Sequence, residues 1–245
     1  MAAKIYELPG IGTVKITKRS GTRSLRLSIA SSGEVRVSIP SWSPYQSGLD
    51  FVRSRADWIQ QNAPPRQQLL QDGHRIGKIH RLKFAATAID TPSSRLNGNE
   101  IKISRPMGMA ITHPEVQKVA RKAGIRALRT QAEIALPKRL RQLADQFGFS
   151  YSSVQIKMLK GRWGSCDTQH NIVLNLYLMQ LPWQLIDYVL IHELVHTKHL
   201  NHGEGFWREF LRHEPRAKGL RSIIKKHQPV LVPVLPTAAN TPSVA

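Results

Sequence analysis

Two histidines four residues apart, His192 and His196, lie in a strongly apolar segment, with Glu193 directly after the first of them. Four residues is close to one helical turn, so on a helix the two imidazoles lie on the same face. Two neutral imidazoles at this spacing can bind one zinc ion, and the adjacent glutamate is a candidate general base. The H-E-x-x-H pattern therefore predicts a metal site that performs hydrolysis.

The surroundings favour a metal site over a chance occurrence of this short pattern. Residues 188–191 and 194–195 are apolar apart from the hydroxyl group of Tyr188, which is typical of a helix buried on most sides. Burying two imidazoles and a carboxylate without partners would cost about 1–3 kcal/mol for each group. A third histidine, His202, follows six residues after His196, beyond a turn. We expect it to complete the ligand set.

Three protein ligands leave the fourth position of a tetrahedral zinc ion for water, as in catalytic sites. Zinc lowers the pKa of that water to about 7 and polarises a carbonyl or phosphoryl oxygen. A structural zinc site usually has a closed shell, often of cysteines, but the single cysteine, Cys166, lies outside the histidine cluster in sequence. We therefore expect one Zn²⁺ per chain, bound by His192, His196 and His202. Glu193 is expected to take a proton from the water and pass it to the leaving group.

Other polar residues near the motif have open roles. His199 is seven residues after His192 and could compete as a ligand, but His202 is preferred because a ligand beyond a turn can approach from another direction. The further candidates are Arg162 as an oxyanion stabiliser or loop anchor, Tyr188 as a site contact or core residue, and Asp187 and Glu204 as hydrogen-bond partners of the ligands.

The composition is that of a globular protein large enough for a sizeable core. The chain has 245 residues, of which 41% are hydrophobic and 21% are charged. One cysteine excludes an intramolecular disulfide and fits a reducing compartment. The first residues lack the apolar core of a signal peptide, and no stretch approaches the roughly 20 apolar residues that cross a bilayer. We expect a cytoplasmic protein without a membrane partner.

Positive charge dominates, because 36 Lys and Arg residues face 16 Asp and Glu residues, for a net charge of +20. Such an excess favours association with nucleic acid, a nucleotide or an acidic protein surface, although solubility alone could also explain it. The basic residues are spread along the chain, no nucleic-acid motif accompanies them, and aromatic residues make up only 7%. Charge therefore leaves nucleotide or nucleic-acid binding open beside a protein or peptide substrate.

The first half of the chain has strand patterns around one helix. Residues 13–39 alternate apolar and polar side chains, which predicts two or three antiparallel strands. Pro44 begins a helix to about residue 62, and short strands are expected at 75–89 and 100–104 with a turn-rich segment between them.

Helices dominate the second half. A capping box at residues 112–115 begins a long helix that ends before Gly148, with Pro137 expected to kink or divide it. Strands at about 154–158 and 172–178 flank a loop at 161–165. The remaining expected elements are the motif helix after Pro182 and helices at 204–213 and 215–227. No internal repeat is evident.

These patterns predict an α+β fold in three parts. Residues 1–112 are expected to form a β-rich N-terminal region with one helix. Residues 113–228 are expected to form the catalytic domain, an antiparallel sheet with the metal-binding helix. Residues 229–245, rich in Pro, Thr, Ser and Ala, are expected to be a disordered tail.

Several segments together resemble the YgjP-like metallopeptidase family, which is related to the SprT-like and WLM zinc peptidases. The resemblance covers most of the chain and implies a zincin-like core. It also implies that His192, His196 and His202 are the zinc ligands and Glu193 the catalytic acid and base. The segments are Arg162-Trp163-Gly164-Ser165-Cys166, Asn175, Asp187-Tyr188-Val189, the H-E-x-x-H motif, Asn201-His202-Gly203 and Phe206-Trp207.

The ligand spacing also matches that of metzincins, but two features differ. His199 occupies the position of their glycine, and no methionine follows residue 179 to form their Met-turn. The chain is therefore not a metzincin proper.

The sequence favours a cytoplasmic zinc endopeptidase and leaves three alternatives. Some YgjP-like proteins have been attributed a pyrophosphatase activity on uridine triphosphate, which the positive charge would suit, although no P-loop is present. A SprT-like protease acting on DNA-bound proteins would also suit the charge. A basic binding module with a structural metal is the third, and the intact Glu193 disfavours it. For a peptidase, the substrate is expected to pair with the sheet edge at residues 172–178.

Overall fold

The computed structural model describes residues 3–30, 33–62 and 69–231, and the chain divides into two compact units, residues 1–68 and 69–245. The expected boundary at residue 112 differs from this division. Residues 69–112 belong to the second unit, because Leu82 and Ile103 lie in the same hydrophobic core as Leu128 of the long helix. Most of the expected disordered tail, residues 232–245, lies outside the described residues.

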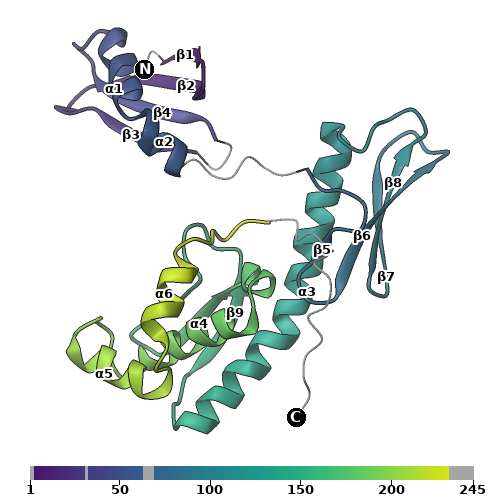
Figure 1. The fold of residues 1–245 in the computed structure, drawn as a ribbon, viewed down its shortest axis with the longest axis vertical. Helices are drawn as coiled ribbons and strands as arrows, with labels where there is room; N and C mark the ends of the chain where they lie inside the picture. Colours follow the sequence, from purple (N-terminus) through teal and green to yellow (C-terminus); the bar gives the residue numbers. More distant parts are fainter. Residues whose placement is uncertain (1–2, 31–32, 63–68, 232–245) are drawn as a thin grey trace. The chain divides into compact units, whose positions relative to one another are not determined.

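The first unit is a four-stranded sheet followed by two helices (Figure 1). Its strand order is β1-β2-β4-β3, and β2 and β4 are parallel, whereas only antiparallel pairing was expected. The first strand was not expected, and the expected single helix is divided at Arg55. The elements are β1 (Ala3–Leu8), β2 (Gly12–Arg19), β3 (Arg26–Ile29), β4 (Val35–Pro40), α1 (Tyr45–Ser54) and α2 (Ala56–Asn62).

The core of the first unit follows from the alternation in its strands. Five alternating apolar side chains of the central strands β2 and β4 are fully or almost fully buried and pack with Val52 of α1 and Ile59 of α2. They are Val14, Ile16, Val35, Val37 and Ile39. Gly48 allows α1 to lie close to the sheet, because a Cβ at this position would be 3.0 Å from Ile16 Cδ1. The intervening side chains therefore face away from the helices.

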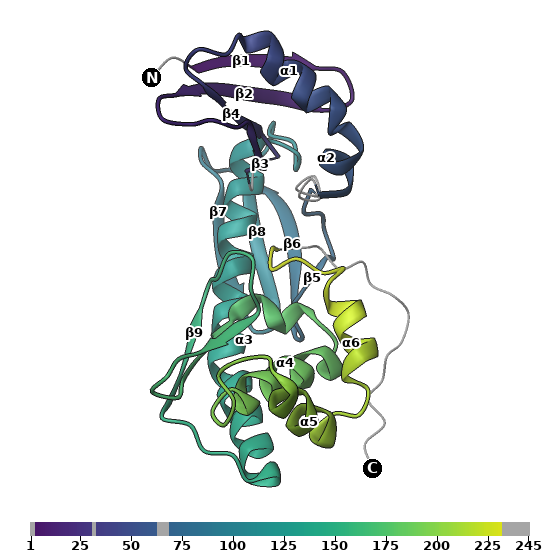
Figure 2. The ribbon, with the colours of Figure 1, turned by 90° about the vertical axis from the view of Figure 1, so that its left-hand side faces the viewer.

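The second unit begins with another four-stranded sheet, which packs on a long helix (Figure 2). One strand, at residues 93–97, lies inside residues 90–99, a segment that was expected to contain only turns. The helix remains a single element through Pro137 and is bent (Figure 1), and its N-cap is His113. The elements are β5 (Arg75–Ile76), β6 (His80–Thr87), β7 (Ser93–Asn97), β8 (Glu100–Pro106) and α3 (Pro114–Phe147).

The two four-stranded sheets have the same topology, although no internal repeat is evident in the sequence. The second has the order β5-β6-β8-β7, with β6 and β8 parallel and the outer pairs antiparallel, as in the first. The central strands also correspond in sequence, because residues 35–40 read VRVSIP and residues 101–106 read IKISRP. Each sheet is followed by helix, so β-β-β-β-α occurs twice.

The rest of the second unit is a three-stranded sheet with four helical segments. The sheet has the order β10-β11-β9, in which β11 and β9 are parallel. Each of the three sheets thus mixes parallel and antiparallel pairs. The expected α+β class is confirmed, but the wholly antiparallel sheet expected for the catalytic domain is wrong, because β9 and β11 pair in parallel. The elements are β9 (Ser153–Lys157), β10 (Gly164–Cys166), β11 (Asn171–Asn175), η1 (Leu176–Gln180), α4 (Trp183–Val195), α5 (Glu204–His213) and α6 (Ala217–Ile224). Within the described ranges, no helix is both long and apolar enough to cross a bilayer.

Candidate active site

Helix α4 holds the H-E-x-x-H motif in the core of the second unit. Pro182 precedes its first turn. Backbone N–H groups there have no partner within the helix, so the N–H that proline lacks costs no hydrogen bond. The helix is apolar on most sides, so neighbouring elements cover nearly all of it. Asp187, which lies on the outward side of the helix, accepts two hydrogen bonds of 2.8 Å from Arg139 of α3. The motif therefore lies on a helix that is fixed by packing and by a bidentate ion pair.

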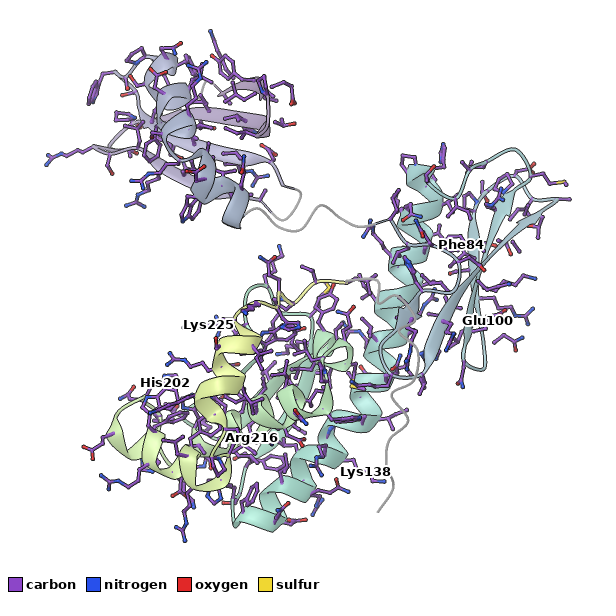
Figure 3. All side chains as sticks on the ribbon, in the orientation of Figure 1. Phe84, Glu100, Lys138, His202, Arg216 and Lys225 are labelled. Carbon is purple, nitrogen blue, oxygen red and sulfur yellow. The ribbon has the colours of Figure 1, made fainter. Side chains whose placement is uncertain are left out.

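The three predicted ligand side chains converge. His192 Nε2 lies 3.2 Å from His196 Nε2 and 3.0 Å from His202 Nε2. His192 lies in the last turn of α4, and His196 is the C-cap of that helix. His202 comes from the segment between α4 and α5 (Figure 3). Ligands in a tetrahedron about 2.0–2.1 Å from zinc lie about 3.4 Å apart, close to these separations. The arrangement fits one metal ion.

The protonation of the imidazoles also fits a cation. His196 Nδ1–H donates a 2.9 Å hydrogen bond to the carbonyl oxygen of His199, which leaves a lone pair on His196 Nε2. Burial lowers the pKa of His192 to about 3 and lowers that of His196. Both rings are therefore neutral at pH 7, the form in which an imidazole nitrogen binds a metal ion.

His199 contacts the site through its backbone carbonyl oxygen. Its ring is not part of the group of side chains that converge at His192, His196 and His202. It lies instead beside Gly205, where an added Cβ would be 3.2 Å from the ring. The preference for His202 over His199 agrees with this geometry.

Glu193 is buried on the side of α4 that faces β10. Its carboxylate lies against Gly164, where a Cβ would be 2.7 Å from Glu193 Oε1. Burial raises the pKa of Glu193 to about 8, and the positive charge of Arg162 opposes that rise. Glu193 Oε2 has no hydrogen-bond partner among the described residues. A buried, unpartnered carboxyl group on the residue that follows His192 is suited to exchange protons with a molecule that enters the site.

Strand β10 is held beside the motif by a buried asparagine. Asn175 is fully buried, and its side-chain amide donates hydrogen bonds of 2.9 and 2.8 Å to the carbonyl oxygens of Leu159 and Arg162. Its backbone N–H donates to the carbonyl oxygen of Trp163. These bonds position the loop that leads into Gly164. They explain the presence of an asparagine at this point of the sequence.

The free edge of the small sheet differs from the one expected. The sequence suggested residues 172–178, but β11 is the central strand and pairs on both sides, and Leu176 begins the 3₁₀-helix η1. The edge strand beside α4 is β10, at residues 164–166. Strand partners come from distant segments, so the edge could not be assigned from the alternation alone.

The other sequence candidates lie in different surroundings. Tyr188 packs between His192 and Phe210, with ring centroids 6.3 and 5.2 Å away. Asp187 pairs with Arg139, and Glu204 is exposed and pairs with Arg208. Neither acid is hydrogen-bonded to a ligand imidazole, so their expected role is not observed.

Arg221 and Phe206 belong to the site although neither was singled out for a role there. Arg221 of α6 lies over the Trp207 ring, 5.0 Å from its centroid, and its charge contributes to lowering the pKa of His192. Phe206 packs against His192, with ring centroids 4.9 Å apart. The apolar spacing in residues 204–213 indicated a packed helix, but nothing in it indicated contact with the imidazoles.

A family model for the YgjP-like metallopeptidase domain matches residues 23–227, which is most of the chain. The chain belongs to this family. As a YgjP-like metallopeptidase it is a hydrolase that cleaves peptide bonds, and its family implies a divalent metal, typically zinc. The converging imidazoles fit such an ion.

Two solved structures similar to this YgjP-like protein are metallopeptidase zymogens. Abylysin from Pyrococcus abyssi is 30% identical over 40% of this chain and 99% of that chain, with a TM-score of 0.35. Jannalysin from Methanocaldococcus jannaschii is 23% identical over 37% of this chain and 95% of that chain, with a TM-score of 0.33. Comparison with curated proteins found no match.

Proposed function

We propose that this YgjP-like metallopeptidase is a cytoplasmic endopeptidase that binds one zinc ion through His192, His196 and His202 and uses Glu193 as its general base. The buried, unpartnered carboxyl group of Glu193 beside three converging imidazoles carries this proposal. Such a group costs stability, so its presence is best explained by chemistry. The cytoplasmic location is supported by the single cysteine, Cys166.

When bound, zinc supplies a Lewis acid that lowers the pKa of a water molecule and polarises the carbonyl group under attack. His192 and His196 suit this ion because both are neutral at pH 7. Glu193 accepts a proton from the attacking water as the new C–O bond forms, and it donates this proton to the amide nitrogen as the C–N bond breaks. The burial that raises the pKa of Glu193 helps it to hold the proton between these steps.

The substrate is proposed to add as an extended strand to β10. This strand pairs only with β11 among the described residues, so its other edge has free backbone donors and acceptors. Gly164 lies on this strand in contact with Glu193. A peptide paired with β10 would therefore pass beside the general base.

A second candidate function is hydrolysis of a nucleoside triphosphate, such as UTP, at the same site. Two exposed arginines favour it, because the charge of Arg162 acts on Glu193 and that of Arg221 acts on His192. Two cations near a metal site suit an anionic substrate. Cleavage of DNA-bound proteins is a further form of the peptidase proposal and requires nucleic-acid binding.

Hydrolysis by zinc-loaded wild type and Glu193→Gln tests the proposal, with an unfolded protein and a panel of nucleoside triphosphates offered separately. Peptide cleavage that falls at least about a hundredfold in the variant is the expected result. Glu204→Gln is the matched control, because Glu204 is an exposed glutamate near the site. Cleavage of triphosphates alone would replace the first candidate with the second. Activity that persists in Glu193→Gln would refute the role of Glu193.

A further inference from the structure

Pairs of cations lie opposite each other at the centre of both four-stranded sheets. Lys15 of β2 is opposite Arg36 of β4, and Lys83 of β6 is opposite Lys102 of β8. Neighbouring strands are about 4.8 Å apart, so these like charges repel each other. Such pairs lower stability in the free protein and are explained most simply by an anionic partner.

The two pairs occupy equivalent positions of the repeated topology. In each sheet the cation pair follows directly after a buried apolar pair, Val14 with Val35 in the first and Leu82 with Ile101 in the second. All four cationic positions alternate with side chains that face the helices, so the cations lie on the outer face of each sheet. The same charge arrangement therefore occurs twice on one chain.

Further cations extend both outer faces. Arg26 of β3 lies opposite Ser38 of β4 in the first sheet, and Arg95 of β7 lies opposite Lys102 in the second. The pairings with acids are weak, because Arg36–Glu34 and Lys83–Asp72 are exposed contacts of 3.4 and 3.6 Å. Lys15, Arg95 and Lys102 make no ion pair among the described residues.

A pocket at one end of the first face has the composition of a phosphate site. It combines three guanidinium groups with three hydroxyl groups and no carboxylate. Its polar lining residues are Arg19, Thr22, Arg23, Ser24, Arg26 and Ser38. Arginine donors match phosphate oxygens in bidentate geometry, and hydroxyl groups supply further hydrogen bonds.

We propose that the outer faces of the two four-stranded sheets bind the phosphate backbone of a nucleic-acid duplex. The outer positions of the central strands carry mostly cations and hydroxyl groups, together with Ala85, two prolines and a single acid, Glu100 opposite Arg81. None is an aromatic platform on which single-stranded bases could stack. Within residues 69–231, no other element covers the outer face of the second sheet (Figure 1). Backbone contacts alone make this binding independent of base sequence. The proposal does not depend on the peptidase activity.

The test is binding of the full-length chain to a DNA duplex of random sequence, followed by fluorescence anisotropy over a range of salt concentrations. The two double variants are Lys15→Gln with Arg36→Gln, and Lys83→Gln with Lys102→Gln. Each double variant is expected to reduce the magnitude of the slope of log K against log salt by about two, because each phosphate contact contributes about 0.9. Zinc-dependent activity should remain at the wild-type level in both variants, which separates this proposal from the proposed function.

The matched control is Lys122→Gln with Arg141→Gln, which removes the same charge from exposed positions of α3. An equal change of slope in the control would refute the proposal, because net charge would then explain the binding. Tighter binding of single strands than of the duplex would also refute it. Binding of polyglutamate but not of duplex, lost in the same variants, would assign the faces to an acidic protein instead.

Discussion

At the scale of single residues, the proposed general base, Glu193, depends on a neighbour without a side chain. Glu193 lies against Gly164, which belongs to a strand and precedes it by 29 positions in the chain. Because a carboxylate buried in contact with backbone has little room to move, any larger residue at 164 must displace Glu193. The motif therefore needs the glycine as well as its own residues.

Gly164→Ala is expected to lower kcat about a hundredfold, because a shift of the base by about 1 Å is enough for such a loss. Zinc affinity should change little, since the added methyl group meets Glu193 and not the imidazoles. Peptide hydrolysis and zinc titration of the purified variant measure the two effects. The control is Gly108→Ala, where a Cβ would meet no atom within 4 Å. Full activity in Gly164→Ala would show that the site tolerates a methyl group there.

At the scale of elements, one lysine joins the second sheet to the start of α4. Lys78 N–H donates a 2.7 Å hydrogen bond to Gln131 Oε1 of α3, and Lys78 Nζ donates to the carbonyl oxygen of Leu181. The same ammonium group lies 5.3 Å from the centroid of the Trp183 ring. Lys78 thus connects three elements at the residues that precede the motif helix.

The pH dependence of unfolding should reveal this partly buried lysine. Burial, assisted by Arg75, lowers the pKa of Lys78 from 10.5 to about 8. Between these values the unfolded chain binds more protons than the folded one, so this residue makes the free energy of unfolding rise as the pH increases. Below pH 8 the cost of the buried charge is present in full, and above about 10.5 it is relieved.

Denaturant unfolding of wild type and Lys78→Met across pH 7 to 11 measures this effect. The other titrating groups are common to both proteins, so the difference between their free energies of unfolding reports on Lys78. The stability of wild type relative to the variant is expected to increase between about pH 8 and 10.5. Lys122→Met, at an exposed position of α3, is the control and should give a constant difference. A constant difference for Lys78→Met as well would mean that the lysine is solvated.

At the scale of the whole molecule, the two units have separate cores. The core of the first unit contains Ile16 and Ile39, whereas that of the second contains the long helix and the residues around the motif. The two sets of core residues have no member in common. Unfolding is therefore expected to occur in two transitions.

Ile16→Ala should lower the free energy of unfolding of the first unit by about 2–5 kcal/mol, because the side chain is fully buried. The second transition should be unchanged, and added zinc should raise its midpoint alone. Calorimetry with and without zinc measures both, and Leu140→Ala in the second core is the converse variant. A single transition that shifts as a whole in each case would show that the units unfold together.

Features that depend on neighbouring residues could be predicted from the amino-acid sequence alone. A helical turn is local, so four-residue spacing placed His192 and His196 on one face, and apolar periodicity located α4 and α5 to within a residue or two. Glu193 and His202 could be proposed for the site because they lie close to these histidines in the sequence. Caps, prolines and Gly148 located the ends of α3 to within one or two residues for the same reason.

Features that depend on distant segments required the tertiary structure. Four features of the structure join residues whose proximity no local pattern encodes. They are the parallel pairing of β2 with β4, the edge position of β10, the contact of Gly164 with Glu193 and the backbone role of His199. The repeated sheet is an extreme case, because a match of five similar residues out of six becomes evident only when the strand order is known. Strand partners are chosen by packing of the whole unit, and this is the physical reason for the difference.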